Sequence, residues 1–259
     1  MRCGMDLTSG PYPQLDSEHD ERGQMEITIV GHSTVLIESE GQRIITDPFF
    51  RTSWNPAYRR LTPPARAMDT LLDVNAVLVS HNHWDHIDGR YFRSLPQTVP
   101  VIVPRKMVWL SKLQGIRNCV GVAPWDSRDF GKIKVTAVPA HHLIVTVGFV
   151  IEAEGKRVYF AGDTYHGSFM REIGVRFKLD AALMPVTTFR IPMTMGERSA
   201  VRAAADLSPK VVIPIHLGIE PRSPLLRTKH SPAGFKQRLQ AAGLNSDVVI
   251  LKEGARWSC

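Results

Sequence analysis

The chain has 259 residues, and its 43% hydrophobic and 22% charged content is typical of a soluble globular protein. No apolar run approaches the roughly 18 to 20 residues that cross a bilayer, and residues 1–24 lack the apolar core of a signal peptide, so we expect a cytoplasmic protein without a transmembrane segment. The net charge of +7 comes from scattered Lys and Arg, which does not by itself indicate nucleic-acid binding. Cys3, Cys119 and Cys259 suggest neither a disulfide framework nor a cysteine metal site.

Residues 1–24 are polar and rich in turn formers, which predicts a flexible leader before a single domain over residues 25–259. Short β-branched runs bounded by Gly, Pro, Asp or Asn recur through that domain and predict strands. In chain order these are EITIV, TVLIE, RIIT, AVLVS, VPVIV, IKVTAV, VGFVIE, RVYFA, AALM, VVIPI and VVIL.

Helices are expected between some of these strands. The clearest is the segment SPAGFKQRLQAAG, in which Ser231 can cap the helix, Pro232 lies in its first turn and Gly243 ends it. Weaker patterns predict helices over Arg105–Gln114, Ser168–Phe177 and Glu197–Leu207. Early hairpins followed by alternating strands and helices indicate a layered α/β protein with mixed sheets.

The segment SHNHWDHIDG, residues 80–89, concentrates possible metal ligands. His81 and His83 are two residues apart, so on an extended backbone both side chains can project to the same side, while Asp85 and His86 follow closely enough to serve a second centre. A polar surface loop with chance histidines is the alternative. The density of ligands in six positions favours one loop that holds two metals.

Other ligand types follow other predicted strands. AVLVS leads into His81, VTAVPA into His141 and His142, VYFAG into Asp163, and VVIPI into His216. Because sites in α/β folds are built where the carboxyl ends of strands meet, these residues are expected to converge.

The motif HxHxDH at His81, His83, Asp85 and His86, with the later His142, Asp163 and His216, resembles the metallo-β-lactamase superfamily over nearly the whole chain after the leader. The segments GHSTVLIE, TDPFF, SHNHWDHID, PAHH, FAGDT and IPIHLG most resemble the branch containing N-acyl-phosphatidylethanolamine-hydrolysing phospholipase D and ascorbate-6-phosphate lactonase.

The resemblance implies a four-layer αββα sandwich and a dinuclear metal centre at one edge of its two mixed sheets. His81, His83 and His142 would bind the first metal, Asp85, His86 and His216 the second, and Asp163 would bridge the two. The family pattern Pro-small-x-His assigns His142 rather than its neighbour in the segment PAHH. Zinc suits these ligands best, although Mn²⁺ or Fe²⁺ would also bind them.

Three further residues are candidates near the centre. Asp47 could accept the outer N–H of a ligand histidine, or it could be a plain turn residue before Pro48. His32 could line the site or be structural, and Asp88 could be functional or a helix cap.

Two metals with a bridging hydroxide predict a hydrolase, in which Asp85 and Asp163 would hold the attacking water. The expected substrate is a phosphodiester, a lactone or a related ester of a small molecule or lipid, with no stable nucleic-acid partner. A nuclease on the same fold and a non-catalytic metal-binding protein remain as alternatives. Candidate cations for an anionic substrate are Arg51, Arg190, Arg222 and Lys229, and candidate apolar wall residues are Phe49, Phe50, Trp54, Phe189 and Met193.

Overall fold

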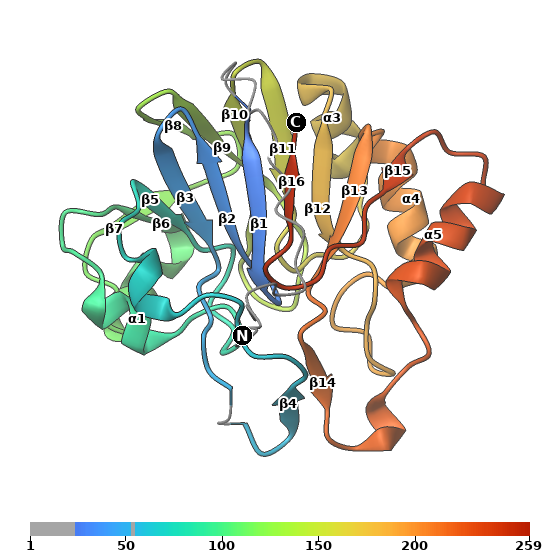
Figure 1. Cartoon of the computed structure of the whole chain (residues 1–259), viewed down its shortest axis with the longest axis horizontal. Helices are drawn as coiled ribbons and strands as arrows, with labels where there is room; N and C mark the ends of the chain where they lie inside the picture. The colour runs from blue at the N-terminus through green and yellow to red at the C-terminus, as the bar shows by residue number, and fades with distance from the viewer. Residues whose placement is uncertain (1–23, 53–54) are drawn as a thin grey trace, which may run out of the picture.

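The computed structural model describes residues 24–52 and 55–259, in which two seven-stranded mixed sheets pack face to face (Figure 1). The first sheet has the order β16-β1-β2-β3-β5-β6-β7. Its β1–β3 and β16 pair antiparallel, whereas β3, β5, β6 and β7 pair in parallel. Its strands are β1 (Glu26–Gly31), β2 (Thr34–Ser39), β3 (Gln42–Thr46), β5 (Ala76–Leu78), β6 (Val101–Pro104), β7 (Cys119–Val122) and β16 (Arg256–Ser258).

The second sheet repeats this plan, with the order β15-β13-β12-β11-β10-β9-β8. Strands β8 to β11 pair antiparallel, and β11, β12, β13 and β15 pair in parallel. Its strands are β8 (Ser127–Phe130), β9 (Ile133–Pro139), β10 (Val147–Ala153), β11 (Lys156–Phe160), β12 (Ala181–Pro185), β13 (Val211–Ile215) and β15 (Asp247–Val248).

Helices cover the outer face of each sheet and complete four layers. One apolar cluster lies between the sheets and includes Ile37 and Phe149, a second packs the later helices on the second sheet, and a third packs α1 on the first. The helices are α1 (Gly89–Ser94), α2 (Val108–Leu113), α3 (Phe169–Phe177), α4 (Glu197–Leu207) and α5 (Pro232–Ala241), with short 3₁₀ turns η1 (Met68–Leu71), η2 (Arg105–Met107) and η3 (Pro224–Leu226). The expected αββα layering with two mixed sheets is confirmed.

A third, two-stranded sheet joins the two halves of the chain. Its strands β4 (Tyr58–Arg60) and β14 (Ile219–Pro221) pair antiparallel and project from one end of the main sheets (Figure 1). Because β4 comes after β3 and β14 after β13, this small sheet connects the halves at the end where those two strands finish.

Most expected elements form close to their predicted bounds, and the deviations have local causes. Helix α4 matches Glu197–Leu207, and Ser231 caps α5 by accepting from the Gly234 N–H. The expected helix at 105–114 divides into η2 and α2. Of the run VVIL only Val248 lies in a strand, where it forms β15 together with Asp247.

Sequence reasoning missed β4, β7, β8, β14, β16 and α1 because these elements are short and carry little periodic apolar pattern. The predicted leader, apart from Gln24, and Trp54 lie outside the described residues. Within the part of the chain that is described, no helix is long and apolar enough to span a bilayer.

Candidate metal centre

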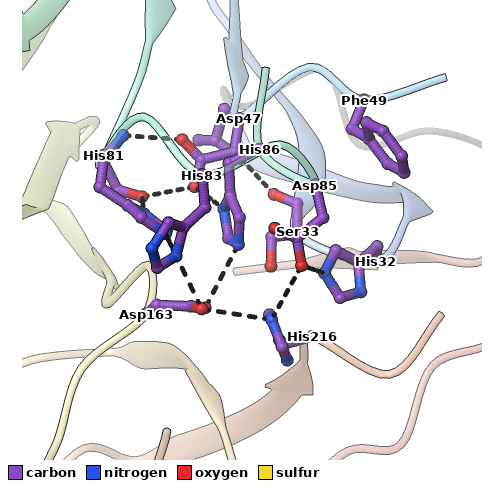
Figure 2. Close-up of polar contacts among 12 residues, drawn as sticks. His32, Ser33, Asp47, Phe49, His81, His83, Asp85, His86, Asp163 and His216 are labelled. Carbon is purple, nitrogen blue, oxygen red and sulfur yellow. Dashed lines mark hydrogen bonds and ion pairs between the residues drawn. The ribbon is translucent and has the colours of Figure 1, made fainter. Parts of the chain in front are cut away.

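Four separate chain segments bring histidines and aspartates together at one end of the two sheets. The loop after β5 carries His81, His83, Asp85 and His86, and His142, Asp163 and His216 follow β9, β11 and β13 respectively. All seven residues predicted from the sequence meet in this cluster, most of which Figure 2 shows. The convergence follows from topology, because these strands end at the same edge.

The cluster divides into two groups of possible ligands. In the first group, Nδ1 of His83 lies 3.0 Å from Nε2 of His81 and 3.2 Å from Nε2 of His142. In the second group, Nε2 of His216 lies 3.8 Å from Oδ2 of Asp85. Nitrogen and carboxylate oxygen atoms therefore converge at two neighbouring points.

Asp163 lies between these groups, and its two carboxylate oxygens face different histidines (Figure 2). Its Oδ1 is 3.4 Å from Nε2 of His86. Its Oδ2 is 3.3 Å from Nε2 of His216, 3.8 Å from Nε2 of His142 and 3.9 Å from Nε2 of His81. One buried carboxylate thus contacts both groups.

His32 lies in the second group. It is buried in the turn between β1 and β2, its Nε2 is 3.4 Å from Oδ2 of Asp85, and its ring centroid is 4.1 Å from that of His216. The backbone of His32 is left-handed, with φ 58°, and its carbonyl accepts from the His216 N–H. The sequence had left a structural role open for His32, whereas the fold makes it an additional possible ligand.

Asp47 holds two of the histidines in place. It is fully buried at the end of β3, and its Oδ2 lies 2.7 Å from Nδ1 of His86. The same carboxylate accepts from the backbone N–H and the hydroxyl of Ser80, whose Oγ is 2.9 Å from Nδ1 of His81. Asp47 therefore orients His86 directly and His81 through Ser80, which fixes the inward direction of both Nε2 atoms.

Electrostatics prepare the cluster for a cation. Burial, reinforced by nearby His216, lowers the pKa of His32 to about 3, and burial lowers the pKa of His142 to about 4. Burial by itself would raise the pKa of Asp163, but the neighbouring His216 and His86 hold it well below its usual range. Neutral imidazoles beside ionised carboxylates are the protonation states in which these groups bind metals. His86 differs, because its burial is outweighed by Asp163 and Asp47, which raise its pKa well above the usual value, so a metal ion bound there would displace a proton.

Several inward-facing atoms form no hydrogen bond within the described part of the chain and lie only in longer ion-pair contacts of the cluster. Nε2 of His86, Oδ1 of Asp163 and Nε2 of His216 are buried without a hydrogen-bond partner among the described residues. Burying a polar atom without a hydrogen bond costs free energy. These nitrogen and oxygen atoms also point toward the centre of the cluster. The donor set and its unpaired atoms therefore fit divalent metal ions.

The two neighbouring histidines of the PAHH segment differ in burial and in their contacts. His142 is buried within the first group, whereas His141 is exposed and uses its backbone to bind Thr164 and Tyr165. Asp88, the other open candidate, caps α1 by accepting from the Arg90 N–H and touches no histidine among the described residues.

An aromatic wall extends from the metal loop to the small sheet. Trp84 lies 5.7 Å from Phe49 and 5.6 Å from Tyr58, and Tyr58 lies 5.5 Å from Phe189, measured between ring centroids. Sequence reasoning named Phe49 and Phe189 but missed Tyr58 and Trp84, although Trp84 stands inside the HNHWDH motif. The expectation that Phe50 lines the cleft is wrong, because Phe50 packs on Tyr91 in the apolar cluster behind the first sheet.

The four predicted cations differ in their availability. Arg51 forms an ion pair with Asp88, with Nε 3.5 Å from Oδ1, and the Arg222 Nε–H donates to the Tyr58 carbonyl. Arg190 and Lys229 are exposed. Among these four residues, only Arg190 and Lys229 have exposed side chains that make no ion pair or hydrogen bond in the described contacts.

Comparison with known proteins agrees with this geometry. A family model described as the β-lactamase superfamily domain matches residues 42–217, which span the metal loop, His142, Asp163 and His216. The fold and site thus define a metal-dependent hydrolase of the metallo-β-lactamase fold. The chain belongs to the β-lactamase superfamily and, within it, to the family of UPF0173 metal-dependent hydrolases.

Relatives of that description match almost from end to end. The UPF0173 metal-dependent hydrolase of Methanopyrus kandleri is 31% identical over 243 residues, covering 89% of this chain and 98% of the relative. That of Lysinibacillus sphaericus is 30% identical over 248 residues, covering 91% and 100%. That of Anoxybacillus flavithermus is 34% identical over 209 residues, covering 76% and 88%.

Solved structures share the fold at lower identity. Igni18, a metallo hydrolase of Ignicoccus hospitalis, superposes with a TM-score of 0.72 at 24% identity and covers 91% of this chain and 98% of its own. An isothiocyanate hydrolase from Delia radicum gut bacteria gives a TM-score of 0.74 at 20% identity and covers 90% and 98%. These similarities establish the layered fold.

Proposed function

We propose that the protein is a hydrolase with a dinuclear metal centre that cleaves a phosphodiester, a lactone or a related ester of a small molecule or lipid. The observation that carries the proposal is the position of Asp163, whose carboxylate lies 3.4 and 3.3 Å from His86 and His216 of the second group. Its Oδ2 also lies 3.8 and 3.9 Å from His142 and His81 of the first group. A closed structural zinc site needs four ligands, and this cluster offers seven or more.

The ligand assignment follows the two groups. His81, His83 and His142 would hold the first metal ion, and Asp85, His86 and His216 the second, with Asp163 shared between them. His32 would either complete the second set or position Asp85. Imidazole with carboxylate suits Zn²⁺ best, and Mn²⁺ or Fe²⁺ bind the same donors.

Divalent ions bound there would supply a water of lowered pKa and polarise the scissile carbonyl or phosphoryl group. The protein supplies the positioning. Asp85 and Asp163 would accept hydrogen bonds from the attacking water and so orient it toward the substrate. Asp47 keeps the His86 ring fixed while charge develops in the site.

Substrate chemistry is proposed from the surroundings of the centre. The aromatic wall of Phe49, Trp84, Tyr58 and Phe189 supports an apolar group beside the scissile bond, and exposed Arg190 supports an anionic group. This combination agrees with the resemblance to the branch of N-acyl-phosphatidylethanolamine-hydrolysing phospholipase D and ascorbate-6-phosphate lactonase.

The test is a screen of metal-reconstituted protein against chromogenic phosphodiesters, lactones and β-lactams, with single-stranded DNA as the nuclease arm. The matched variants are Asp163→Ala and Asp180→Ala, because both aspartates are largely buried, at 3% and 8% exposure. Asp180 precedes β12 and pairs with Lys210, away from the cluster.

We expect turnover of an ester, lost in Asp163→Ala and kept in Asp180→Ala. Turnover that survives Asp163→Ala, or a preference for DNA over every ester, would contradict the proposal.

A further inference from the structure

A pocket of about 400 Å³ opens beside His142. It lies between the end of β6 with η2, the turn between β7 and β8, and the loop between β9 and β10. Its volume falls in the range of about 300 to 1,000 Å³ that is typical of small-molecule sites. His142, a predicted metal ligand, forms part of its wall, so the pocket adjoins the site.

The walls of this pocket are mainly apolar. Val122, Ile144, Val145 and Val147 line it, together with prolines and alanines. Val145 is 40% exposed and presents an accessible aliphatic surface to this pocket. An apolar body of moderate size would fill this space.

The rim of the same pocket is positively charged. Arg105 and Lys106 both line it, and its described lining includes no aspartate or glutamate. Arg105 pairs with Asp126, whereas exposed Lys106 has no ion pair among the described residues. The rim therefore favours a ligand that carries an acidic oxygen group.

His142 gives the inner wall an unused hydrogen-bonding atom. With Nε2 directed at the cluster, its Nδ1 is buried without a partner among the described residues. The outer nitrogens of His81 and His86 are satisfied by Ser80 and Asp47. Nδ1 of His142 is therefore a buried polar atom beside the pocket that forms no hydrogen bond with the described residues.

We infer that this pocket, lined by Val122, Ile144, Val145 and Val147 with Lys106 at its rim, binds the part of the substrate that is not hydrolysed. That part is an apolar body bearing a carboxylate, phosphate or sulfonate group. The inference rests on the proposed hydrolase function and assigns its substrate class as amphipathic anions. Pocket binding then holds the scissile bond next to His142 and Asp163.

The test uses 8-anilino-1-naphthalenesulfonate, an apolar anion whose fluorescence rises on leaving water, with the metal-loaded protein. Ala123→Trp fills the pocket from the β7–β8 turn, away from the ligand-bearing loops, and Lys106→Glu reverses the rim charge. Leu143→Trp is the matched control, because Leu143 is 59% exposed on the same loop as Ile144 and does not line the pocket. Metal content and thermal melting are measured for every variant to verify folding.

We expect the wild type to bind one probe saturably, and both pocket variants to weaken binding by about tenfold or more, while the control changes less than about twofold. The probe should also inhibit wild-type hydrolysis competitively. Equal binding by all four proteins, or binding without competition, would overturn the inference while leaving the hydrolase intact. Probe binding with this variant pattern, but with no ester hydrolysed by the wild type, would instead overturn the proposed function and retain the pocket as an anion site.

Discussion

Replacing Asp47 by Asn should weaken metal binding without removing any predicted metal ligand. The carboxylate of Asp47 accepts from Nδ1 of His86 at 2.7 Å and from both donors of Ser80 at 2.6 and 2.7 Å. An Asn side chain keeps one acceptor oxygen and turns the other into an amide donor. The three donors are the His86 ring N–H, the Ser80 hydroxyl and the Ser80 backbone N–H. At least one of them then faces the new amide N–H of the Asn, and the orientation of His86 or of the Ser80–His81 pair is lost.

The magnitude follows from how many ligands Asp47 controls. Loss of a partner that orients one ligand histidine typically costs about 10- to 100-fold in metal affinity. That range equals about 1.4 to 2.7 kcal/mol. Because Asp47 acts on His86 directly and on His81 through Ser80, we expect the upper half of the range.

The assay is a competition titration of Zn²⁺ between the protein and a chromogenic chelator, with the second variant Asp88→Asn as control. Asp88 is also fully buried and also accepts several hydrogen bonds, but its partners include the Arg90 backbone and guanidinium and no histidine. Asp88→Asn should lower the melting temperature and leave zinc affinity within about twofold. Equal zinc affinities for Asp47→Asn and the wild type would refute the reasoning.

The reconstituted wild type should carry close to two metal ions per chain by elemental analysis, and His216→Ala close to one, because only the second group loses a histidine; two ions in both proteins would show that His216 is no ligand. His142→Ala should cost far more metal and activity than His141→Ala, since His141 lies outside the cluster, and equal losses would show that the assignment is misplaced. His32→Gln should change the affinity of the second metal more than that of the first, because His32 touches only the Asp85 side, and stepwise titration measures both. For an anionic ester, Arg190→Ala should raise KM more than it lowers kcat, and kcat/KM should fall as salt screens the attraction; an unchanged KM at low salt would exclude Arg190 from substrate binding.

Local pattern determined much of this protein from the sequence alone. The β-branched runs located the principal strands because these strands are buried on both faces and need continuous apolar runs. Ser231 with Pro232 located the start of α5 because capping is local chemistry. The same reasoning gathered eight possible ligands, His141 and His142 both included, since ligands at the carboxyl ends of neighbouring strands must meet at one edge. The segment PAHH, through family resemblance, also selected His142 over His141.

Tertiary packing decided what local pattern could not. The short strands β4 and β14 pair residues such as Arg59 and Glu220, which are 161 positions apart, so local sequence does not indicate them. They nevertheless carry Tyr58 to Trp84 and help to build the aromatic wall. Phe49 and Phe50 are adjacent in sequence, but their side chains point in different directions. Phe50 packs in the apolar cluster behind the first sheet, and Phe49 contacts Trp84 in the aromatic wall. His32 is a lone histidine in a tight turn, and only the approach of β13 brings it beside Asp85 and His216. These contacts depend on how two sheets and their connecting loops pack in space, and sequence spacing within each segment does not contain that information.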